Sequence, residues 1–227
     1  IMSKNKKNII IVGNSNNDYL NWLGKLKGFN IKVINSLKDF NTINDKEESI
    51  DLVVFTGGSD VNPDYYGQSI GKFTHIDKER DAFEVSVWER LPKSIVKIGI
   101  CRGSQFLTAM SGGSLVQHVN GHGGEHIIST KEDFNLKMTS THHQMMYPND
   151  LSKDAYDLIA WSTYFKSDTY LNGKNEEMEI PREFLEPEIV YYKNTNALAI
   201  QGHPEFSSCN TETSDYCLDL VRNLLNK

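Results

Sequence analysis

Short apolar segments alternate with amphipathic ones along most of this 227-residue chain, and the alternation limits the folds that it can adopt. The apolar runs predict strands at residues 8–12, 31–34, 50–55 and 94–100. Helical spacing of apolar residues is clearest over 77–91. Strands that alternate with helices form a mostly parallel sheet with helices on both faces. The sequence therefore predicts an α/β fold in which the sheet is the middle of three layers.

The second half of the chain predicts a hairpin and a closing helix. Residues 189–192 and 197–201 predict two antiparallel strands, and the apolar spacing over 215–225 predicts an amphipathic helix. The polar stretch 161–187 has no regular pattern, so it is either an ordered excursion or a mobile flap. We find no internal repeat and no low-complexity linker, and we therefore expect residues 1–227 to form one domain.

Cys101 lies where the strand predicted at 94–100 meets a helix. Gly99 and Gly103 stand two residues away on either side, as a sharp strand-to-helix turn requires, because only small residues fit beside a side chain at its apex. The turn also places Cys101 at a helix N-terminus, where the dipole and free N–H groups favour a thiolate. A buried structural cysteine beside two incidental glycines is the alternative interpretation.

A second motif, His203-Pro204-Glu205, follows the predicted hairpin. In extended backbone, residues i and i+2 project from the same side, so Glu205 can hold one nitrogen of His203 while the other nitrogen faces a thiol. A structural histidine beside a solvated glutamate is the alternative. Together with the turn at Cys101, the motif predicts a Cys-His-Glu nucleophilic site made of Cys101, His203 and Glu205.

Attack of a thiolate on a carbonyl carbon also requires N–H donors for the oxyanion that forms. The backbone N–H of Arg102, the residue after Cys101, is one candidate. The pair Gly57-Gly58 follows the strand predicted at 50–55, and glycine lets a backbone approach a substrate closely. We therefore expect an oxyanion hole from Gly58 and Arg102, with a plain turn as the alternative for the two glycines.

Composition and charge exclude several function classes. The net charge is −6, which argues against a nucleic-acid partner. The apolar runs are too short for a signal peptide or a membrane span, so we expect no membrane partner. Three cysteines do not make a disulfide framework, which favours a cytoplasmic location.

Six segments resemble the class I glutamine amidotransferase superfamily and, within it, the gamma-glutamyl hydrolase-like branch of the peptidase C26 type. In chain order they are TGGSDVNP at 56–63 with YG at 66–67, RDAFE at 80–84, GICRGSQ at 99–105, GGSLVQ at 112–117, STHHQ at 140–144 and QGHPE at 201–205. The resemblance implies a class I glutamine amidotransferase-like fold, which is a three-layer, flavodoxin-like sandwich with a mostly parallel central sheet.

The same resemblance implies a chemistry. Cys101 would attack a gamma-glutamyl amide carbonyl, with His203 as base and then acid and Glu205 orienting it. A small-molecule gamma-glutamyl compound is then the substrate. Residues 80–84 resemble scaffold rather than chemistry. The residues implied around the glutamyl group are Gly57, Gln105, Ser140, Thr141, His142 and His143.

His118, His122 and His126 stand four residues apart, a spacing that converges on a metal ion when the segment is a helix. Glycines at 121, 123 and 124 argue against a helix there. We therefore expect neither a metal site nor a cofactor.

Three functions from different classes fit these features. The first is a free-standing hydrolase that passes a gamma-glutamyl group to water. The second is a glutaminase subunit that delivers ammonia to a separate synthetase partner. The third is a binding protein that shares the turn at Cys101 on a similar fold, although such a protein does not need an oriented base. The amine half of the substrate and the oligomeric state have no signature in the sequence.

Overall fold

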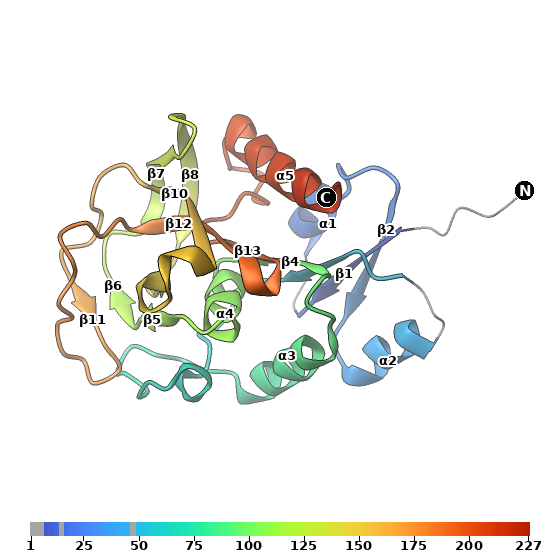
Figure 1. Cartoon of the computed structure of the whole chain (residues 1–227), viewed down its shortest axis with the longest axis horizontal. Coiled ribbons are helices and arrows are strands. Elements are labelled where there is room, and N and C mark those ends of the chain that lie inside the picture. Colours follow the sequence, from blue (N-terminus) through green and yellow to red (C-terminus); the bar gives the residue numbers. More distant parts are fainter. Residues whose placement is uncertain (1–6, 14–15, 46–48) are drawn as a thin grey trace, which may run out of the picture.

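Five strands form the parallel part of a central sheet (Figure 1), in a computed structural model that describes residues 7–13, 16–45 and 49–227. In sheet order they are β2 (Phe29–Ile34), β1 (Lys7–Val12), β3 (Leu52–Phe55), β4 (Val96–Ile100) and β13 (Ala197–Ile200). Each pairs in parallel with its neighbour, and β1 to β4 are the four strands predicted from the sequence. Because parallel strands share a direction, the carboxyl ends of β3, β4 and β13 lie at one edge of the sheet.

Four antiparallel strands continue the same sheet beyond β13. They are β12 (Pro187–Tyr192), β10 (Tyr156–Ser162), β7 (Gly123–Thr130) and β8 (Asn135–Thr141). The hairpin of β12 and β13 is the predicted one, and its turn ends at Asn196 in the left-handed conformation with φ 51°. The β7–β8 hairpin was not expected from the sequence. The described residues also form two small antiparallel sheets. One pairs β5 (Ser114–Val116) with β9 (Met145–Tyr147), and the other pairs β6 (His118–Val119) with β11 (Tyr170–Leu171).

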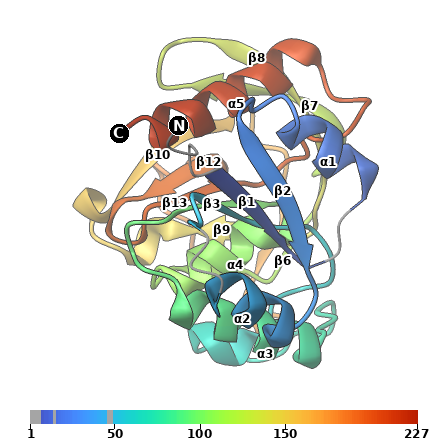
Figure 2. The same cartoon turned by 90° about the vertical axis from the view of Figure 1, so that its right-hand side faces the viewer.

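Helices cover both faces of the parallel part (Figure 1). On one face lie α1 (Asn17–Leu23) and α5 (Thr211–Leu225), and on the other lie α2 (Leu37–Asp45), α3 (Lys78–Arg90) and α4 (Arg102–Met110). Figure 2 shows the same layering from the side. The predicted α/β fold with a central sheet between two helical layers is confirmed. Short 3₁₀ turns occur at Pro63–Tyr66, Pro148–Asp150, Lys153–Ala155 and Lys193–Thr195.

The two faces of β1 show why both layers form. Successive side chains of a strand point to opposite faces. Ile9 and Ile11 pack in the core that contains the apolar residues of α1 and α5. Ile10 and Val12 pack in the second core, with apolar residues of α2, α3 and α4. A strand that is apolar at every position is therefore buried on both sides, as parallel strands are.

Some local details differ from the sequence expectation. The apolar spacing from Tyr19 to Leu26 predicts one helix, but α1 ends at Leu23 and is capped by Gly24. Helix α2 was not expected, because its many Asn and Asp residues hide the spacing of its buried side chains. The stretch 161–187 is an ordered excursion, since the Glu186 carboxylate accepts hydrogen bonds from the backbone N–H groups of residues 166 and 167. Among the helices of the described residues, none is long and apolar enough to cross a lipid bilayer.

Candidate active site

Cys101 occupies a strained turn between β4 and α4. Its φ of 53° and ψ of −111° lie in a region that non-glycine residues rarely adopt. The Cys101 N–H donates to the carbonyl oxygen of Ile200 at 2.8 Å, which fastens the turn to β13. A Cβ on Gly99 would collide with the backbone of Gly103, and one on Gly103 would collide with the carbonyl of Phe55. The two glycines are therefore needed for the close contact of β4, α4 and β3.

His203 and Glu205 follow β13 and lie at the same edge of the sheet. The His203 Nδ1–H donates to Glu205 Oε1 at 2.8 Å, and both side chains are buried. The Phe206 ring stacks on the imidazole with centroids 4.1 Å apart and planes 10° apart. Burial opposes a charge on the imidazole, but hydrogen bonds with Cys101 and Glu205 outweigh it and raise the pKa of His203 to about 10. The imidazole is thus held beside the thiol in a form that readily carries a proton.

Two hydroxyl groups that the sequence did not single out for this purpose contact the site. The hydroxyl of Thr141 lies 2.9 Å from His203 Nε2. The hydroxyl of Tyr19, on α1, accepts from the N–H of Gly57 at 2.9 Å. Burial and the nearby charge of Glu205 raise the pKa of Tyr19, so this hydroxyl stays neutral. In the sequence Tyr19 belongs to the apolar face of a helix, and this pattern gives no sign of its second contact.

A pocket of about 380 Å³ opens at this edge of the sheet. Eight of the predicted site residues line it: Gly58, Cys101, Arg102, Gln105, Thr141, His142, His143 and His203. Four further residues complete its wall, namely Ser59, Asp60, His75 and Gln144. Gly57 and Glu205 lie behind the lining, against Cys101 and His203. Ser140 is fully buried outside the lining, so its side chain does not face the pocket.

Three charged side chains, Asp81, Glu84 and Arg102, lie buried near the nucleophile turn, and the half-buried Arg80 joins them. The Arg102 guanidinium forms ion pairs with both Asp81 and Glu84 on α3. Arg80 reaches the same Glu84 with its Nε at 2.8 Å. Each carboxylate therefore has an arginine partner. The expectation that residues 80–84 serve as scaffold agrees with this arrangement.

Arg80 also supports the loop after β3. One of its terminal nitrogens donates to the carbonyl of Gly57 at 2.8 Å, and the other donates to the carbonyl of Thr56 at 3.0 Å. Gly58 has φ +145°, and a Cβ at this position would collide with the Arg80 guanidinium. The loop can therefore pass over Arg80 only as glycine, with its backbone at the pocket surface.

The opposite wall of the pocket is made by the segment after β8. His143 Nε2 lies 3.1 Å from Asp60 Oδ1, and this hydrogen bond raises the pKa of His143. The His142 Nδ1–H donates to the carbonyl of Gln144 at 2.7 Å, and the same carbonyl accepts from Gln105 Nε2 at 3.1 Å. Burial lowers the pKa of His142 well below its usual value, so its imidazole is neutral.

The evenly spaced histidines have partners that their spacing in the sequence does not predict. The segment 118–126 contains β6 and the start of β7 rather than a helix, as expected. Even so, two of the three histidines approach buried carboxylates near β12: His126 Nε2 lies 2.7 Å from Glu188, and His122 Nε2 lies 3.1 Å from Glu186. His118 lies apart from this group and stacks on a phenylalanine ring. Spacing along a single segment does not reveal the partners that other strands supply.

Comparisons with known proteins agree with this description. The sequence profile of the Peptidase C26 family matches residues 3–157. A protein of Rickettsia prowazekii, provisionally named as glutamine amidotransferase-like, is 42% identical over 82 residues, which make up 35% of this chain and 29% of that protein. A Lactococcus lactis protein with a similar provisional name is 26% identical over 190 residues, which are 74% of this chain and 70% of its own. The match with the Rickettsia protein thus covers less than a third of that protein's length.

Two solved structures have a similar fold. One is a Thermoplasma acidophilum protein whose name assigns it provisionally to a GMP synthase, as one of its subunits, with a TM-score of 0.63, 18% identity and coverage of 97% of this chain and 93% of that chain. The other is a glutamine amidotransferase from Thermotoga maritima, with a TM-score of 0.53, 15% identity and coverage of 97% and 84%. These similarities concern the fold.

Proposed function

The chain belongs to the Peptidase C26 family, and on this basis we propose that it is a cysteine-dependent hydrolase of gamma-glutamyl amide bonds. The observation that carries the proposal is the strained Cys101 beside the His203–Glu205 pair, at the end of a pocket of about 380 Å³. A scaffold has no need of a cysteine with φ 53° at a pocket wall. A nucleophile does, because the strain exposes its sulfur to a substrate.

In the proposed first step, the Cys101 thiolate attacks the gamma-carbonyl carbon of the substrate. A carbon–sulfur bond forms, and the carbonyl oxygen becomes an oxyanion held by the N–H groups of Gly58 and Arg102. His203 then gives its proton to the leaving nitrogen, and the carbon–nitrogen bond breaks to release an amine or ammonia. The raised pKa of His203 supports this role, since the imidazole starts the cycle protonated.

In the second step, His203 acts as a base. It takes a proton from a water molecule, whose oxygen attacks the thioester carbonyl. The second oxyanion collapses, the carbon–sulfur bond breaks, and glutamate leaves while the thiolate–imidazolium pair is restored. Glu205 keeps the imidazole orientation through both steps, and the stacked Phe206 ring limits its rotation.

The far end of the pocket suits the head of a gamma-glutamyl group. That head carries an ammonium and a carboxylate on one carbon atom. Asp60 and His143, which lie 3.1 Å apart on the lining, offer a carboxylate for the ammonium and an imidazole for the carboxylate. We propose that Asp60 binds the ammonium and His143 the carboxylate, which extends the substrate-binding residues expected from the sequence.

A glutaminase subunit that passes ammonia to a synthetase is the second candidate. It is favoured by the solved structure whose name refers to a GMP synthase. Both candidates use the same thioester, and they differ in dependence on a partner. A hydrolase releases glutamate from a gamma-glutamyl amine at full rate alone, whereas a glutaminase of this kind is slow until a synthetase is added.

The proposal can be tested by covalent labelling and a substrate screen. A diazoketone analogue of glutamine should alkylate Cys101 in the folded protein, as detected by peptide mass spectrometry. Cys209 and Cys217 are matched internal controls, because burial raises the pKa of both thiols and should keep them unlabelled. Glutamate release should then be measured for glutamine and a series of gamma-glutamyl amines, with Cys101→Ala as blank. Failure to label Cys101, together with no glutamate from any compound, would refute the proposed chemistry.

A further inference from the structure

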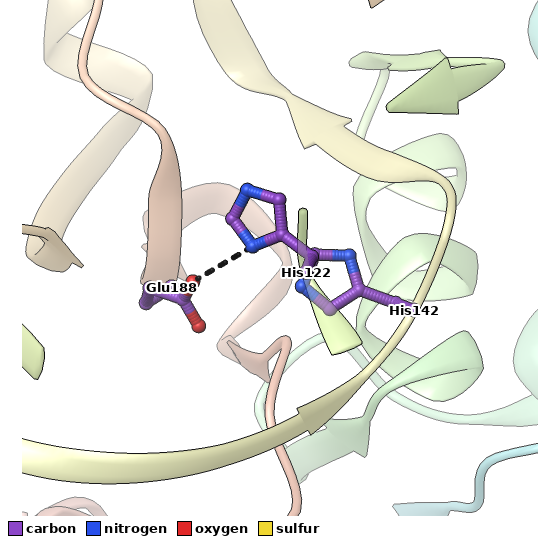
Figure 3. A group of neighbouring side chains, drawn as sticks. All are labelled: His122, His142 and Glu188. Atoms are coloured by element: carbon purple, nitrogen blue, oxygen red, sulfur yellow. Dashed lines mark ion pairs between the residues drawn. The ribbon is translucent and has the colours of Figure 1, made fainter. Parts of the chain in front are cut away.

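Behind the pocket wall, three buried side chains bring atoms that can bind a metal close together. They are His122, before β7, His142, after β8, and Glu188, on β12 (Figure 3). One ligand-type atom from each lies within 4.8 Å of those from the other two. His122 Nδ1, His142 Nε2 and Glu188 Oε2 are all buried and have no hydrogen-bond partner among the described residues. Buried polar atoms are seldom left in this state, so the group calls for an explanation.

The other atoms of the two histidines determine where their protons lie. His122 Nε2 is 3.1 Å from the Glu186 carboxylate, which can only accept, so this nitrogen carries the proton. His142 Nδ1 is 2.7 Å from the carbonyl of Gln144, which also only accepts. The remaining nitrogen of each ring, His122 Nδ1 and His142 Nε2, is the one without a hydrogen-bond partner among the described residues. His122 Nδ1 lies 3.7 Å from Glu188 Oε1 (Figure 3), so two ring nitrogens and a carboxylate face one another across a gap that no described hydrogen bond bridges.

A water molecule does not resolve this arrangement. It can donate two hydrogen bonds, and three acceptors converge here, so one would remain unpaired. The charge balance points the same way. Glu186 and Glu188 are both fully buried, and within the described part of the chain their ion-pair partners are His122 and His126 rather than a lysine or an arginine. A cation at the meeting point would satisfy both the lone pairs and the charge.

We propose that His122 Nδ1, His142 Nε2 and Glu188 bind a divalent transition-metal ion, with zinc as the first candidate. Two imidazole nitrogens and one carboxylate oxygen form a donor set that zinc accepts, with a fourth position left for water. Ligand atoms about 2.0–2.2 Å from a tetrahedral ion are about 3.4 Å apart, so binding draws these three side chains together by small rotations. Harder ions such as magnesium prefer a shell of oxygen atoms and fit less well.

The surroundings have the hydrogen bonds that commonly support metal ligands. Histidine ligands usually donate their other ring N–H to a carboxylate or a backbone carbonyl, and ligand carboxylates are themselves hydrogen-bonded. Here His122 donates to Glu186, His142 donates to the Gln144 carbonyl, and Glu188 Oε1 accepts from His126 Nε2 at 2.7 Å. All three ligands are thus already oriented.

The ion would brace the pocket rather than take part in its chemistry. His142 lines the pocket, and the carbonyl that accepts from it also accepts from Gln105 on α4. A metal bond to His142 Nε2 would therefore hold the Gln144 carbonyl and the Gln105 amide in place. It would connect β7, β8 and β12 with the helix that begins at the nucleophile turn.

The test measures metal binding in a protein that lacks the nucleophile. Cys101→Ala removes the thiol that could otherwise bind zinc with His203. This variant, purified without a metal-affinity step, is titrated with zinc against a chromophoric chelator, and its melting temperature is recorded with zinc and with chelator. We expect one equivalent of tightly bound zinc and a higher melting temperature in its presence.

His142 and His143 are neighbours in the chain, so their alanine variants provide a matched test and control. In the Cys101→Ala background, His142→Ala and Glu188→Gln should lose the bound equivalent, while His143→Ala should keep it. Glu186→Gln should weaken binding about 10- to 100-fold, as expected for a residue that acts through a ligand. The proposal is overturned if no stoichiometric zinc binds, which would leave a shared proton in the cluster, or if zinc still binds to both His142→Ala and Glu188→Gln.

Cobalt(II) gives an answer that does not depend on these variants folding. Bound to Cys101→Ala, it should show the visible absorption of a tetrahedral or five-coordinate site with nitrogen and oxygen ligands. A thiolate-to-cobalt charge-transfer band would place the ion at Cys209 or Cys217 instead and would contradict the proposal. Neither readout involves turnover, so the result is independent of the proposed hydrolase activity.

Discussion

Two buried clusters of carboxylates flank the pocket, and they balance their charge in different ways. Beneath the nucleophile turn, Asp81 and Glu84 are paired with two arginines. Behind the opposite wall, Glu186 and Glu188 are paired with histidines, and acceptor atoms of the group remain unpartnered. Both clusters lie in the protein interior. An uncompensated charge there costs several kcal/mol, because it has lost its hydration.

The difference separates a scaffold from a binding site. In the first cluster both carboxylates have arginine partners, and the unpartnered buried atom is a donor, Arg102 Nε, which offers no lone pair to a cation. In the second cluster the unpartnered atoms include ring nitrogens and a carboxylate oxygen, which the proposed metal ion would bind. Burial and charge alone would have classed the two groups together, whereas the count of donors and acceptors distinguishes them.

The largest expected effect tests whether the two sides of the pocket act independently. Cys101→Ala should lower glutamate release roughly 10⁴- to 10⁶-fold, because no other group can form the thioester. The protein should keep its far-ultraviolet circular dichroism and one equivalent of zinc. Residual turnover within about tenfold of the unmodified protein would mean that Cys101 is not the nucleophile.

The next effect concerns a third buried carboxylate, Glu205, which also accepts from a histidine. Glu205→Gln should reduce kcat/KM roughly 10²- to 10⁴-fold by loosening the imidazole orientation, with the thiol still present. Steady-state kinetics on the best gamma-glutamyl compound provides the measurement. Zinc stoichiometry is the control and should stay at one, in contrast to Glu188→Gln. Loss of zinc from Glu205→Gln would show that Glu205 belongs to the same group as Glu186 and Glu188.

Stability should distinguish the two clusters directly. Arg102→Met leaves Asp81 and Glu84 without their shared partner and should lower the free energy of unfolding by about 3–5 kcal/mol. In the presence of a chelator, Glu188→Gln removes one charge from a cluster with an excess of acceptors. This substitution should change the free energy of unfolding by at most about 1 kcal/mol. Urea unfolding of both variants gives the comparison. A larger loss for Glu188→Gln than for Arg102→Met would contradict the charge balance described here.

The smallest effect is a pH dependence from His203. Its folded pKa of about 10 lies above the ordinary value of about 6.5 for an unfolded histidine. A group with a raised folded pKa stabilises the protein most below its unfolded pKa, and this contribution disappears as the pH rises through the folded pKa. The difference in unfolding free energy between the unmodified protein and His203→Gln should therefore be greatest near pH 6 and fall towards pH 10. A difference that is flat or grows with pH would mean that the imidazole is neutral in the folded protein.

The elements that carry the nucleophile site were predictable from local patterns. The strand at β4, the glycines around Cys101 and the i, i+2 spacing of His203 and Glu205 are all short-range features, and the parallel sheet brings strand ends to one edge. Tyr19 and Phe206 were not predictable as parts of this site, because each appears in the sequence as an ordinary aromatic residue. Ser140 was expected among the substrate-binding residues, and its side chain lies buried outside the pocket lining.

The sequence by itself determined the alternating elements, the order of the family segments and the residue types that a thiol hydrolase requires. The pairing of His203 with Glu205 was visible in the sequence, but the tertiary structure alone decided which carboxylates the other buried histidines meet. Spacing along one segment predicts convergence only when that segment is a helix, whereas His122 precedes β7, His142 follows β8 and Glu188 lies on β12 of the antiparallel part of the sheet. Strand pairing brings together residues that are far apart in the chain. The donors and acceptors that remain unpaired can therefore be identified only in the folded structure.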